Sequence, residues 1–345
     1  MAAQGSVPDT LGVDDGPRDA SATADPRRGG IGGGAVVVVA ALLTGLRWID
    51  ADRPAPLAAL QAMVPWLVAP VMLVLAFATA TRRWRTAVGA FALLCVHAAL
   101  LVPWWIAEDP AGALGGPPLT VMVANLQYGR GDAEAVVRAV RELDADVVVL
   151  IEATAGARTA LRRAGLDRLL PHVVGRTRAD AGGMIIHSRH ALDDGDAPPA
   201  PSLAFETLVT RVRAPGGDVL IVGAHPLAPW PGNTVRWHAE VGALAGWSAR
   251  VPGDVPLVVA GDLNGSSDHP VIRRFARSGM VDAHEVAGAG RPLTWPNGGR
   301  LLPPLLHLDH VLARDLHPVA AGTVDVPGSD HAAVWARLRR VQAPR

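Results

Sequence analysis

Three long apolar stretches occupy the first third of the chain, at residues 31–46, 57–81 and 87–106. A helix that crosses a bilayer needs about 20 apolar residues, with about 17 as the lower limit. The second and third stretches meet this length, and the first falls just short of it. Trp104 and Trp105 close the third stretch, where aromatic rings favour the membrane interface. We therefore expect three transmembrane helices.

Arginine placement predicts the orientation of these helices, because basic loops stay on the cytoplasmic side. Arginines at residues 27–28 precede the first stretch, and three more at residues 82–85 separate the second stretch from the third. No small-residue cleavage site precedes Arg47, which argues against a signal peptide. We expect residues 1–30 to form a disordered cytoplasmic tail. Three spans then place everything after the third stretch outside the cytoplasm, in a multi-pass protein of the plasma membrane.

From Leu119 onward, apolar runs typical of buried strands alternate with amphipathic stretches typical of helices. The expected strands lie in LTVMVAN, DVVVLIE, GGMIIHS, AFETLVTRVRA, GDVLIVGAH, VPLVVAGDLN, LLHLDHVLA and HAAVWARLR, and the expected helices at residues 132–143, 154–164, 233–250 and 270–278. Such alternation predicts an α/β domain with helices covering the sheets. We place this domain at residues 119–340, after a linker over residues 107–118.

Composition and charge narrow the class of protein. Half of the 345 residues are hydrophobic, which excludes a disordered or fibrous chain. The chain has 32 basic residues, all arginine, and 32 acidic ones, so its formal net charge is zero. A net charge of zero argues against a protein that coats nucleic acid with a basic surface. The single cysteine, Cys95, excludes an intrachain disulfide and a cysteine-based zinc site.

Six of the expected strands or strand-like runs lead into polar side chains of the types that catalysis uses. These are Asn125, Glu152, His225, Asp262 with Asn264, Asp309, and Asp330 with His331. A single residue of this kind is more often a helix cap or a solvated loop residue, as we read His190, His269 and His310. Six together indicate one catalytic site on the loops at the strand ends.

The oxygen-bearing members of this set suit a hard divalent metal. Asn125, Glu152 and Asp330 offer carboxylate and amide oxygens, which Mg²⁺ and Mn²⁺ prefer over imidazole. Asp262 and Asn264 are two residues apart, so an extended backbone would point both side chains to the same face. One reacting group would then meet a carboxylate and an amide donor together.

The histidines supply the proton chemistry. His331 is a candidate general base, and Asp309 could fix the tautomer of its ring. His225, on another strand, can donate to a developing oxyanion. The sequence contains no glycine-rich phosphate loop, no zinc spacing of cysteine and histidine, and no GxSxG nucleophile motif. The set therefore predicts metal-assisted hydrolysis.

The order N, E, H, GDLN, LDH and SDH resembles the endonuclease/exonuclease/phosphatase superfamily of DNase I-like, metal-dependent phosphoesterases, from Leu119 to Arg340. The resemblance implies a four-layer α/β sandwich, in which helices flank two packed mixed sheets. It implies Mg²⁺ as the cofactor, with Mn²⁺ or Ca²⁺ as alternatives. Gln127 stands where many DNA-repair members have an acidic residue, which argues against an abasic-site endonuclease.

The same resemblance implies a role for each polar residue. Glu152 would be the main metal ligand, with Asn125 and Asp330 completing the metal and phosphate shell. Asp262 would orient the attacking water or hold a second metal. His331 would be the general base, paired with Asp309, and Asn264 and His225 would stabilise charge on the phosphoryl oxygens.

Three spans and an external catalytic domain are similar to the VanJ-type membrane members linked to teicoplanin resistance. This similarity implies a lipid-linked phosphate as substrate and the lipid bilayer as partner, without an obligate protein partner. The loops PLAPWP after His225 and LLPPLL before Asp309 are apolar, whereas a nuclease groove is lined with basic residues. Two alternatives stay open: an extracytoplasmic, membrane-anchored nuclease, and a non-catalytic resistance protein that binds a wall precursor.

Overall fold

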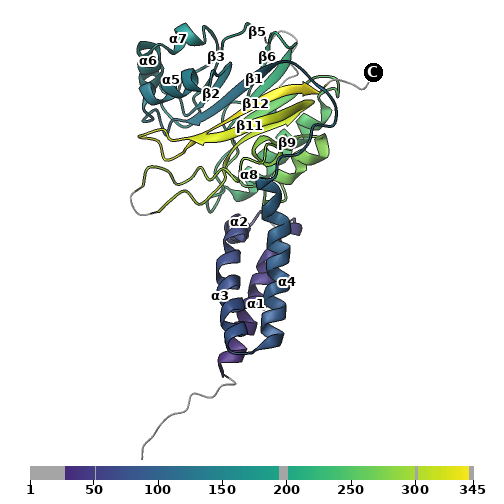
Figure 1. Ribbon diagram of the computed structural model, residues 1–345. Coiled ribbons are helices and arrows are strands. Elements are labelled where there is room, and N and C mark those ends of the chain that lie inside the picture. Colours follow the sequence, from purple (N-terminus) through teal and green to yellow (C-terminus); the bar gives the residue numbers. More distant parts are fainter. Residues whose placement is uncertain (1–27, 51, 194–200, 300–301, 342–345) are drawn as a thin grey trace, which may run out of the picture.

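A computed structural model describes residues 28–50, 52–193, 201–299 and 302–341, so most of the expected N-terminal tail lies outside it. Helices α1 (Arg28–Gly45), α3 (Val68–Ala80) and α4 (Trp84–Leu101) lie side by side as a stalk beneath an α/β part. Figure 1 shows this division of the chain. The shorter helix α2 (Ala55–Ala62) lies where the stalk meets the α/β part.

The structure supports the three expected spans only in part. Helix α4 and the 3₁₀ turn η3 (Val102–Trp105) together form one described helix that is long and apolar enough to cross a membrane. Helix α2 and the segment of η2 (Val64–Leu67) and α3 pass the same test as a pair, but a 56° bend separates them. Pro65 at the start of η2 has no N–H to donate, which favours a break there. The first apolar helix, Gly32–Trp48, is shorter.

The described residues of the α/β part form two six-stranded mixed sheets. The first has the order β11 (Leu316–Val324), β12 (Ala333–Val341), β1 (Leu114–Asn125), β2 (Val147–Ile151), β4 (Met184–Ser188) and β3 (His172–Arg176). The second has the order β5 (Leu192–Asp193), β6 (Leu208–Val212), β7 (Val219–Ala224), β8 (Leu257–Asp262), β10 (Asp309–Arg314) and β9 (Val281–Asp282).

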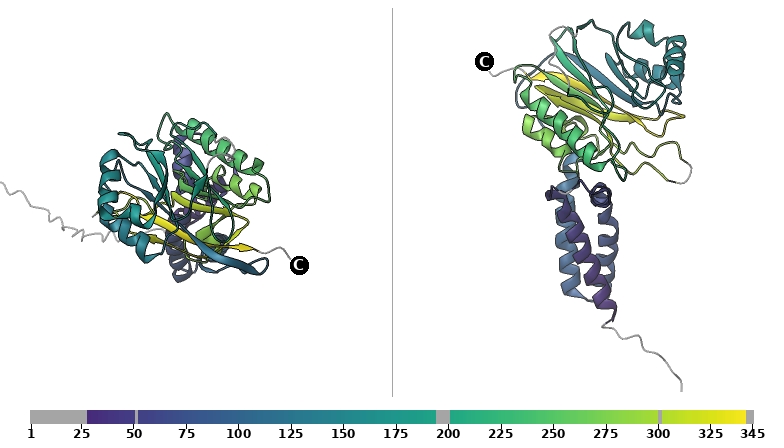
Figure 2. Two further views of the ribbon diagram at one scale, coloured as in Figure 1. Left: turned by 90° about the horizontal axis from the view of Figure 1, so that it is seen from above. Right: turned by 180° about the vertical axis from the view of Figure 1, so that it is seen from behind.

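The sheets pack face to face, and helices cover both outer faces (Figure 2), so the expected four-layer sandwich is confirmed. The core between the sheets is aliphatic, with Val123, Val149, Ile221 and Val258 fully buried. Helices α5 (Ala133–Glu142), α6 (Ala155–Ala164) and α7 (Leu166–Leu169) cover the first sheet; α8 (Thr234–Arg250) and the 3₁₀ helix η4 (Ile272–Ser278) cover the second, and the short α9 (Ala283–Val286) contacts β10 and β11.

Several expected boundaries were wrong. Strand β1 begins at Leu114, inside the expected linker, and the helix expected at residues 270–278 is 3₁₀ rather than α. Strand β10 begins at Asp309 instead of running through the preceding apolar residues. Strands β3, β5, β9 and β11 were not expected, because they are short or partly exposed and lack a continuous apolar run.

Strand direction places all six polar strand ends at one edge of the sandwich. Strands β1 and β2 are parallel, as are β7 and β8, so each pair contributes its carboxyl ends. Strands β12 and β10 are antiparallel to β1 and β8, so they contribute their starts at the same edge. Each sheet thus supplies two strand ends and one strand start.

Polar contacts fix the stalk to the α/β part. Asp52, fully buried between α1 and α2, accepts a hydrogen bond from Val271 N at 3.0 Å and pairs with His238 Nδ1. His269 Nδ1 accepts from Ser266 N at 3.0 Å, so its Nε2 carries the hydrogen that is donated to Ala58 O in α2, at 2.9 Å. The neutral ring is therefore a part of this junction.

Acid is expected to weaken this junction through His269. Burial lowers the pKa of the His269 ring in the folded chain. In the unfolded chain the same ring has its ordinary pKa of 6.5, so it becomes protonated at a higher pH than in the folded chain. The stabilising effect is complete above pH 6.5 and is lost as the pH falls, by up to about 1.4 kcal/mol per pH unit. Thermal unfolding in detergent between pH 7.0 and 5.0 should show this slope, and His269→Gln should reduce it. An equal slope in the variant would exclude His269 as its cause.

Candidate active site

The polar residues at the shared edge come from both sheets. Asn125 ends β1, Glu152 follows β2, His225 follows β7, Asp262 ends β8, Asp309 begins β10 and His331 precedes β12. Five of these six side chains are at most 7% exposed, and that of Glu152 is 12% exposed. The expectation that these residues meet is thus confirmed for the six of them.

Asn125 links the two sheets at the centre of the cluster. Its Nδ2 donates to Glu152 Oε1 at 3.3 Å and to Asp262 Oδ2 at 3.1 Å. Its Oδ1 accepts from Gln127 N at 2.9 Å, and this backbone donor fixes which way the amide points. Asn125 therefore presents a donor to the two carboxylates. Its role as an oxygen ligand of a metal stays a prediction.

The backbone of Glu152 has a strained conformation. Its φ is +56°, in the left-handed region that residues with a Cβ rarely adopt. Its Oε2 accepts from the backbone N–H of Tyr128 at 2.8 Å. Gln127, Tyr128 and Asn264, on neighbouring loops, also have positive φ. Such residues concentrate at functional sites, where the surrounding structure holds them in place.

His331 and Asp309 form a buried dyad. His331 Nδ1 lies 2.7 Å from Asp309 Oδ2, and its Nε2 lies 3.6 Å from Asp262 Oδ2. Burial alone would lower the pKa of His331, but the charges of Asp309 and Asp262 raise it to about 10. Burial raises the pKa of Asp309. Because the carboxylates favour the imidazolium, the proton affinity of His331 depends on the charge that Asp262 carries.

His225 turns one ring nitrogen toward the carboxylates. Its Nδ1 lies 3.2 Å from the carbonyl oxygen of Ala181 and must donate to it, and its ring stacks on Phe205 with centroids 4.9 Å apart. Its Nε2 lies 3.9 Å from Asp262 Oδ2 and 4.0 Å from Glu152 Oε1. This nitrogen can donate to a bound anion when the ring carries both protons.

The structure places Asn264 and Asp330 differently from the expectation. Asn264 has a φ of +52° and donates from Nδ2 to Pro226 O at 3.1 Å, so the extended backbone assumed for Asp262 and Asn264 is wrong. The carboxylate of Asp330 accepts from Trp295 Nε1 at 3.3 Å. Among the described residues, no hydrogen bond or ion pair joins Asp330 to Glu152. Its role as a metal ligand stays a prediction.

Three residues that position the side chains of the site were not identified from the sequence. Ser329 Oγ donates to Asn125 O at 2.7 Å and accepts from His331 N at 3.0 Å, which ties β1 to the dyad. Thr294 Oγ1 lies 3.4 Å from Asp309 N, and Trp295 holds Asp330. Ser329 could have been inferred from its place before Asp330 and His331, because short polar side chains often bond the backbone two residues on. Nothing in the sequence marked the other two.

The donor set at the edge fits a hard dication. Two carboxylates, of Glu152 and Asp262, converge from different sheets on one amide. Asp262, Asp309 and His331 each offer a ligand atom within 4.8 Å of the others. Asp309 Oδ1 is buried and has no hydrogen-bond partner among the described residues. Carboxylate oxygens of this kind favour Mg²⁺, Mn²⁺ or Ca²⁺.

Similar structures share this fold. An endonuclease/exonuclease/phosphatase from Beutenbergia cavernae DSM 12333 is 21% identical, with a TM-score of 0.51 over 66% of this chain and 73% of its own. A truncated Caenorhabditis elegans TDP2 is 18% identical, with a TM-score of 0.52 over 66% of this chain and 100% of its own. D. rerio TDP2, complexed with single-strand DNA product, is 15% identical, with a TM-score of 0.51 over 64% and 98% of the two chains.

A comparison with curated proteins gives no significant match. The profile of the Endonuclease/Exonuclease/phosphatase family, in contrast, matches residues 122–331, which is more than half of the chain. The matched segment begins in β1 and ends at His331, so it contains the whole cluster. The chain therefore belongs to the endonuclease/exonuclease/phosphatase family and is an enzyme of the metal-dependent phosphoesterase type.

Proposed function

We propose that this protein is a membrane-anchored phosphoester hydrolase that uses Mg²⁺ and acts on a lipid-linked phosphate outside the cytoplasm, as in VanJ-type proteins. The observation that carries the proposal is that the candidate site and the apolar stalk lie at the same end of the α/β part. Trp66, between α2 and α3, donates to Leu305 O at 3.0 Å. Leu305 pairs with Trp295, whose ring nitrogen holds Asp330 beside His331.

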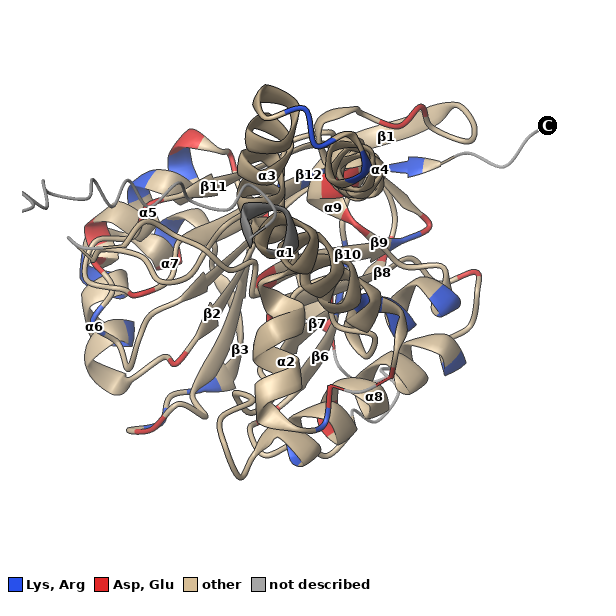
Figure 3. Cartoon of the chain, turned by 90° about the horizontal axis from the view of Figure 1, so that it is seen from below, with Lys and Arg blue, Asp and Glu red and all other residues tan. Residues whose placement is uncertain are grey.

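The surface of the stalk supports its placement in a bilayer. Large apolar side chains face outward and are between 51% and 73% exposed, namely those of Leu42, Leu73, Phe77, Val88 and Phe91. Polar groups lie inside instead, where Thr44 Oγ1 and His97 Nε2 are 3.1 Å apart. A helical bundle in water has the reverse arrangement, with polar side chains outside. Seen from below, the stalk helices α1, α3 and α4 are almost free of charged residues (Figure 3).

The arginines support the proposed orientation. The turn at residues 82–85 and the start of α1 lie at the end of the stalk that is remote from the α/β part. Basic residues at both places favour the cytoplasmic side. The catalytic domain is then extracytoplasmic, anchored by α1, by α2 with α3, and by α4.

In the proposed mechanism, Glu152 and Asp262 hold the metal, and Asp309 and His331 move the proton. The dication, when bound, supplies electrostatic polarisation of the phosphoryl group. Asp309 keeps the Nδ1 hydrogen of His331 in place, so that Nε2 faces the site. His331 then takes the proton of the attacking water at Nε2 as the oxygen bonds to phosphorus. The bond from phosphorus to the leaving oxygen breaks, and the proton passes on to that oxygen.

His225 and Asn264 are proposed to stabilise negative charge on the phosphoryl oxygens. His225 Nε2 lies near both Glu152 and Asp262, so it could donate to a phosphoryl oxygen bound beside these carboxylates. Asn264 Nδ2 uses one hydrogen for Pro226 O and retains a second one. Binding of a cation by Asp262 would offset one of the carboxylate charges that raise the pKa of His331, which favours the neutral base.

Apolar side chains around the site favour a lipid over nucleic acid. Tyr128, Trp230 and Leu302 are between 54% and 62% exposed, and they lie on loops that follow Asn125, His225 and Trp295. These loops can contact acyl or prenyl chains at the bilayer surface. A nuclease groove would instead present arginine side chains to successive phosphates.

The test is hydrolysis by the full-length protein in detergent micelles, with Mg²⁺ or with EDTA. The substrates are bis-p-nitrophenyl phosphate, plasmid DNA, a phospholipid and a polyprenyl pyrophosphate. We expect Mg²⁺-dependent hydrolysis of at least one lipid, lost in His331→Ala. Cleavage of plasmid alone, falling steeply with salt, would overturn the lipid substrate in favour of a nuclease. No hydrolysis of any substrate by folded protein would contradict the proposed catalysis itself.

A further inference from the structure

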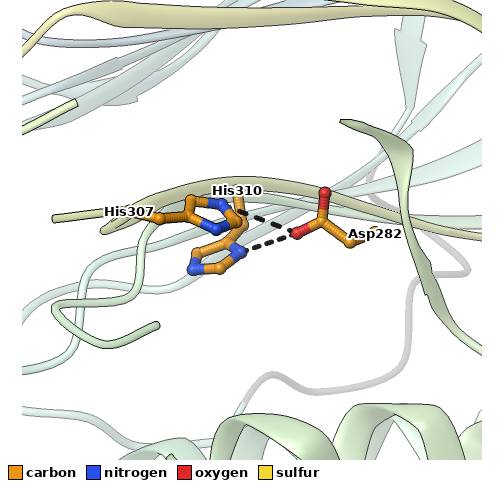
Figure 4. Close-up of side chains that lie close together, drawn as sticks. All are labelled: Asp282, His307 and His310. Atoms are coloured by element: carbon orange, nitrogen blue, oxygen red, sulfur yellow. Dashed lines mark hydrogen bonds and ion pairs between the residues drawn. The ribbon is translucent and has the colours of Figure 1, made fainter. Parts of the chain in front are cut away.

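A second polar cluster lies in the second sheet, separate from the candidate active site. It consists of Asp282 at the end of β9, His307 just before β10, and His310 in β10 (Figure 4). The rings of His307 and His310 stack with centroids 3.9 Å apart, and both point toward the carboxylate of Asp282. Both histidines are completely buried. His310 follows Asp309 directly, so strand alternation turns its side chain to the face opposite the dyad.

The hydrogen bonds of His310 leave a lone pair facing a carboxylate. Its Nε2 lies 2.8 Å from Gly265 O, and because a carbonyl only accepts, this nitrogen carries the hydrogen. In a neutral ring, Nδ1 then has only a lone pair, yet it lies 2.9 Å from Asp282 Oδ2. Two acceptors at this distance repel each other unless a proton or a cation lies between them.

His307 adds a second unsatisfied group at the same carboxylate oxygen. Its Nε2 lies 3.6 Å from Asp282 Oδ2, beyond hydrogen-bond distance, and neither ring nitrogen has a hydrogen-bond partner among the described residues. An unpaired buried polar group of this kind is destabilising. A neutral imidazole binds metals through the ring nitrogen that carries no hydrogen, and His307 has such a nitrogen without a hydrogen-bond partner among the described residues.

We propose that Asp282, His307 and His310 bind a divalent transition metal, with Zn²⁺ as the ion of choice. A tetrahedral ion with bonds of about 2.0–2.1 Å places its ligand atoms about 3.3 Å apart. The two separations from Asp282 Oδ2, 2.9 Å to His310 and 3.6 Å to His307, lie on either side of that value. Two imidazoles and one carboxylate favour Zn²⁺ over Mg²⁺.

A fourth donor lies close by. His284 is 1% exposed, and its Nδ1 has no hydrogen-bond partner among the described residues and lies 3.9 Å from Asp282 Oδ1. Its Nε2 lies 3.1 Å from Gly322 O, so it donates there and leaves Nδ1 as an acceptor. Movement of the His284 ring toward the other three ligands would complete a closed four-ligand set, which is the pattern of a structural zinc site.

The position of the cluster predicts a structural role at the junction with the membrane. Trp104, in η3 at the end of the last long helix, packs edge-on against His307 with centroids 5.5 Å apart. The metal would join β9 and β10 beneath this contact. None of its ligands belongs to the candidate active site, so the inference does not depend on the proposed function.

The test is the metal content of the full-length protein, purified in detergent through an affinity tag without histidine. We expect about one zinc per chain that remains after brief EDTA treatment, because the ligands are buried. His307→Phe preserves the ring stacking but removes the ligand, and it should lose this zinc. His190→Ala, a histidine change outside the cluster, should retain it. Protein produced with Co²⁺ should show the visible absorption of a four-coordinate site, absent in His307→Phe.

Folded wild-type protein without bound zinc, and without that Co²⁺ absorption when loaded, would overturn the inference. Asp282 and His310 would then be a buried imidazolium–carboxylate pair. Zinc that is retained in His307→Phe and lost in Asp262→Asn would also overturn it, since the ion would belong to the candidate active site. If His307→Phe does not fold, the Co²⁺ spectrum of the wild type decides, because a four-coordinate site gives a strong visible band and a six-coordinate, oxygen-rich site gives a weak one.

Discussion

Glu152→Gln is expected to lower Mg²⁺-dependent phosphoester hydrolysis by about 10³-fold or more. Glutamine retains the shape and can still accept from Tyr128 N, but it removes the charge that we propose holds the metal. Metal-ion stabilisation of the transition state amounts to several kcal/mol, and each 1.4 kcal/mol is a factor of ten in rate. The kcat/KM measured against Mg²⁺ concentration should also show a higher half-saturating concentration.

A matched substitution of an exposed glutamate distinguishes the loss of a metal ligand from the mere loss of one acidic residue. Glu134, in the first turn of α5, is exposed, so Glu134→Gln should leave both kcat/KM and the Mg²⁺ dependence unchanged. Wild-type Mg²⁺ dependence in Glu152→Gln, with kcat/KM reduced less than tenfold, would exclude Glu152 as the principal ligand.

His331→Ala is expected to lower kcat by about 10²–10⁴-fold, the usual contribution of a general base. Asp309→Asn should lower kcat as well, because it removes the negative charge beside Nδ1 and brings in an amide donor that favours the wrong tautomer of the ring. The double variant should be little worse than His331→Ala, since the two side chains act as one unit. Additive losses would contradict the dyad.

The pH profile distinguishes a base from a structural histidine. A base acts when deprotonated, so kcat/KM should rise with pH up to the pKa of His331, and His331→Ala should lack this limb. The charge of Asp309 raises the pKa of His331, and Asp309→Asn should therefore shift the limb to lower pH. An unshifted limb in Asp309→Asn would mean that another group titrates.

The apolar runs in the sequence predicted that the polar residues beside them meet, and the strand directions in the structure explain why six of them do. Glu152 and Asp262 each follow a continuous apolar run, and the ends of such buried parallel strands share one edge. His331 reaches the same edge because β12 runs antiparallel to β1. The alternation of the same apolar runs with amphipathic helices predicted an α/β domain with helices covering the sheets, and the four-layer arrangement was implied by the family resemblance.

The orientation of individual side chains could not be predicted in the same way. The Asn125 amide is set by one backbone donor, Gln127 N, that comes from a loop of irregular shape. Asn264 adopts a left-handed conformation, which a period-two argument for strands does not anticipate. His307 and His310 meet Asp282 only through the antiparallel pairing of β9 with β10, and the two residues of β9 give no periodic signal.

The most direct test of the central claim compares hydrolysis of a lipid-linked phosphate in the same vesicles as the protein with its hydrolysis in separate vesicles. Full-length protein is reconstituted with polyprenyl pyrophosphate in the same bilayer, or it is mixed with separate vesicles that carry this lipid. With Mg²⁺ present, we predict phosphate release when protein and lipid share a bilayer, and little release when they are in separate vesicles. Equal release in both arrangements, or release that EDTA and Glu152→Gln leave unchanged, would contradict a metal-dependent site that faces its own membrane.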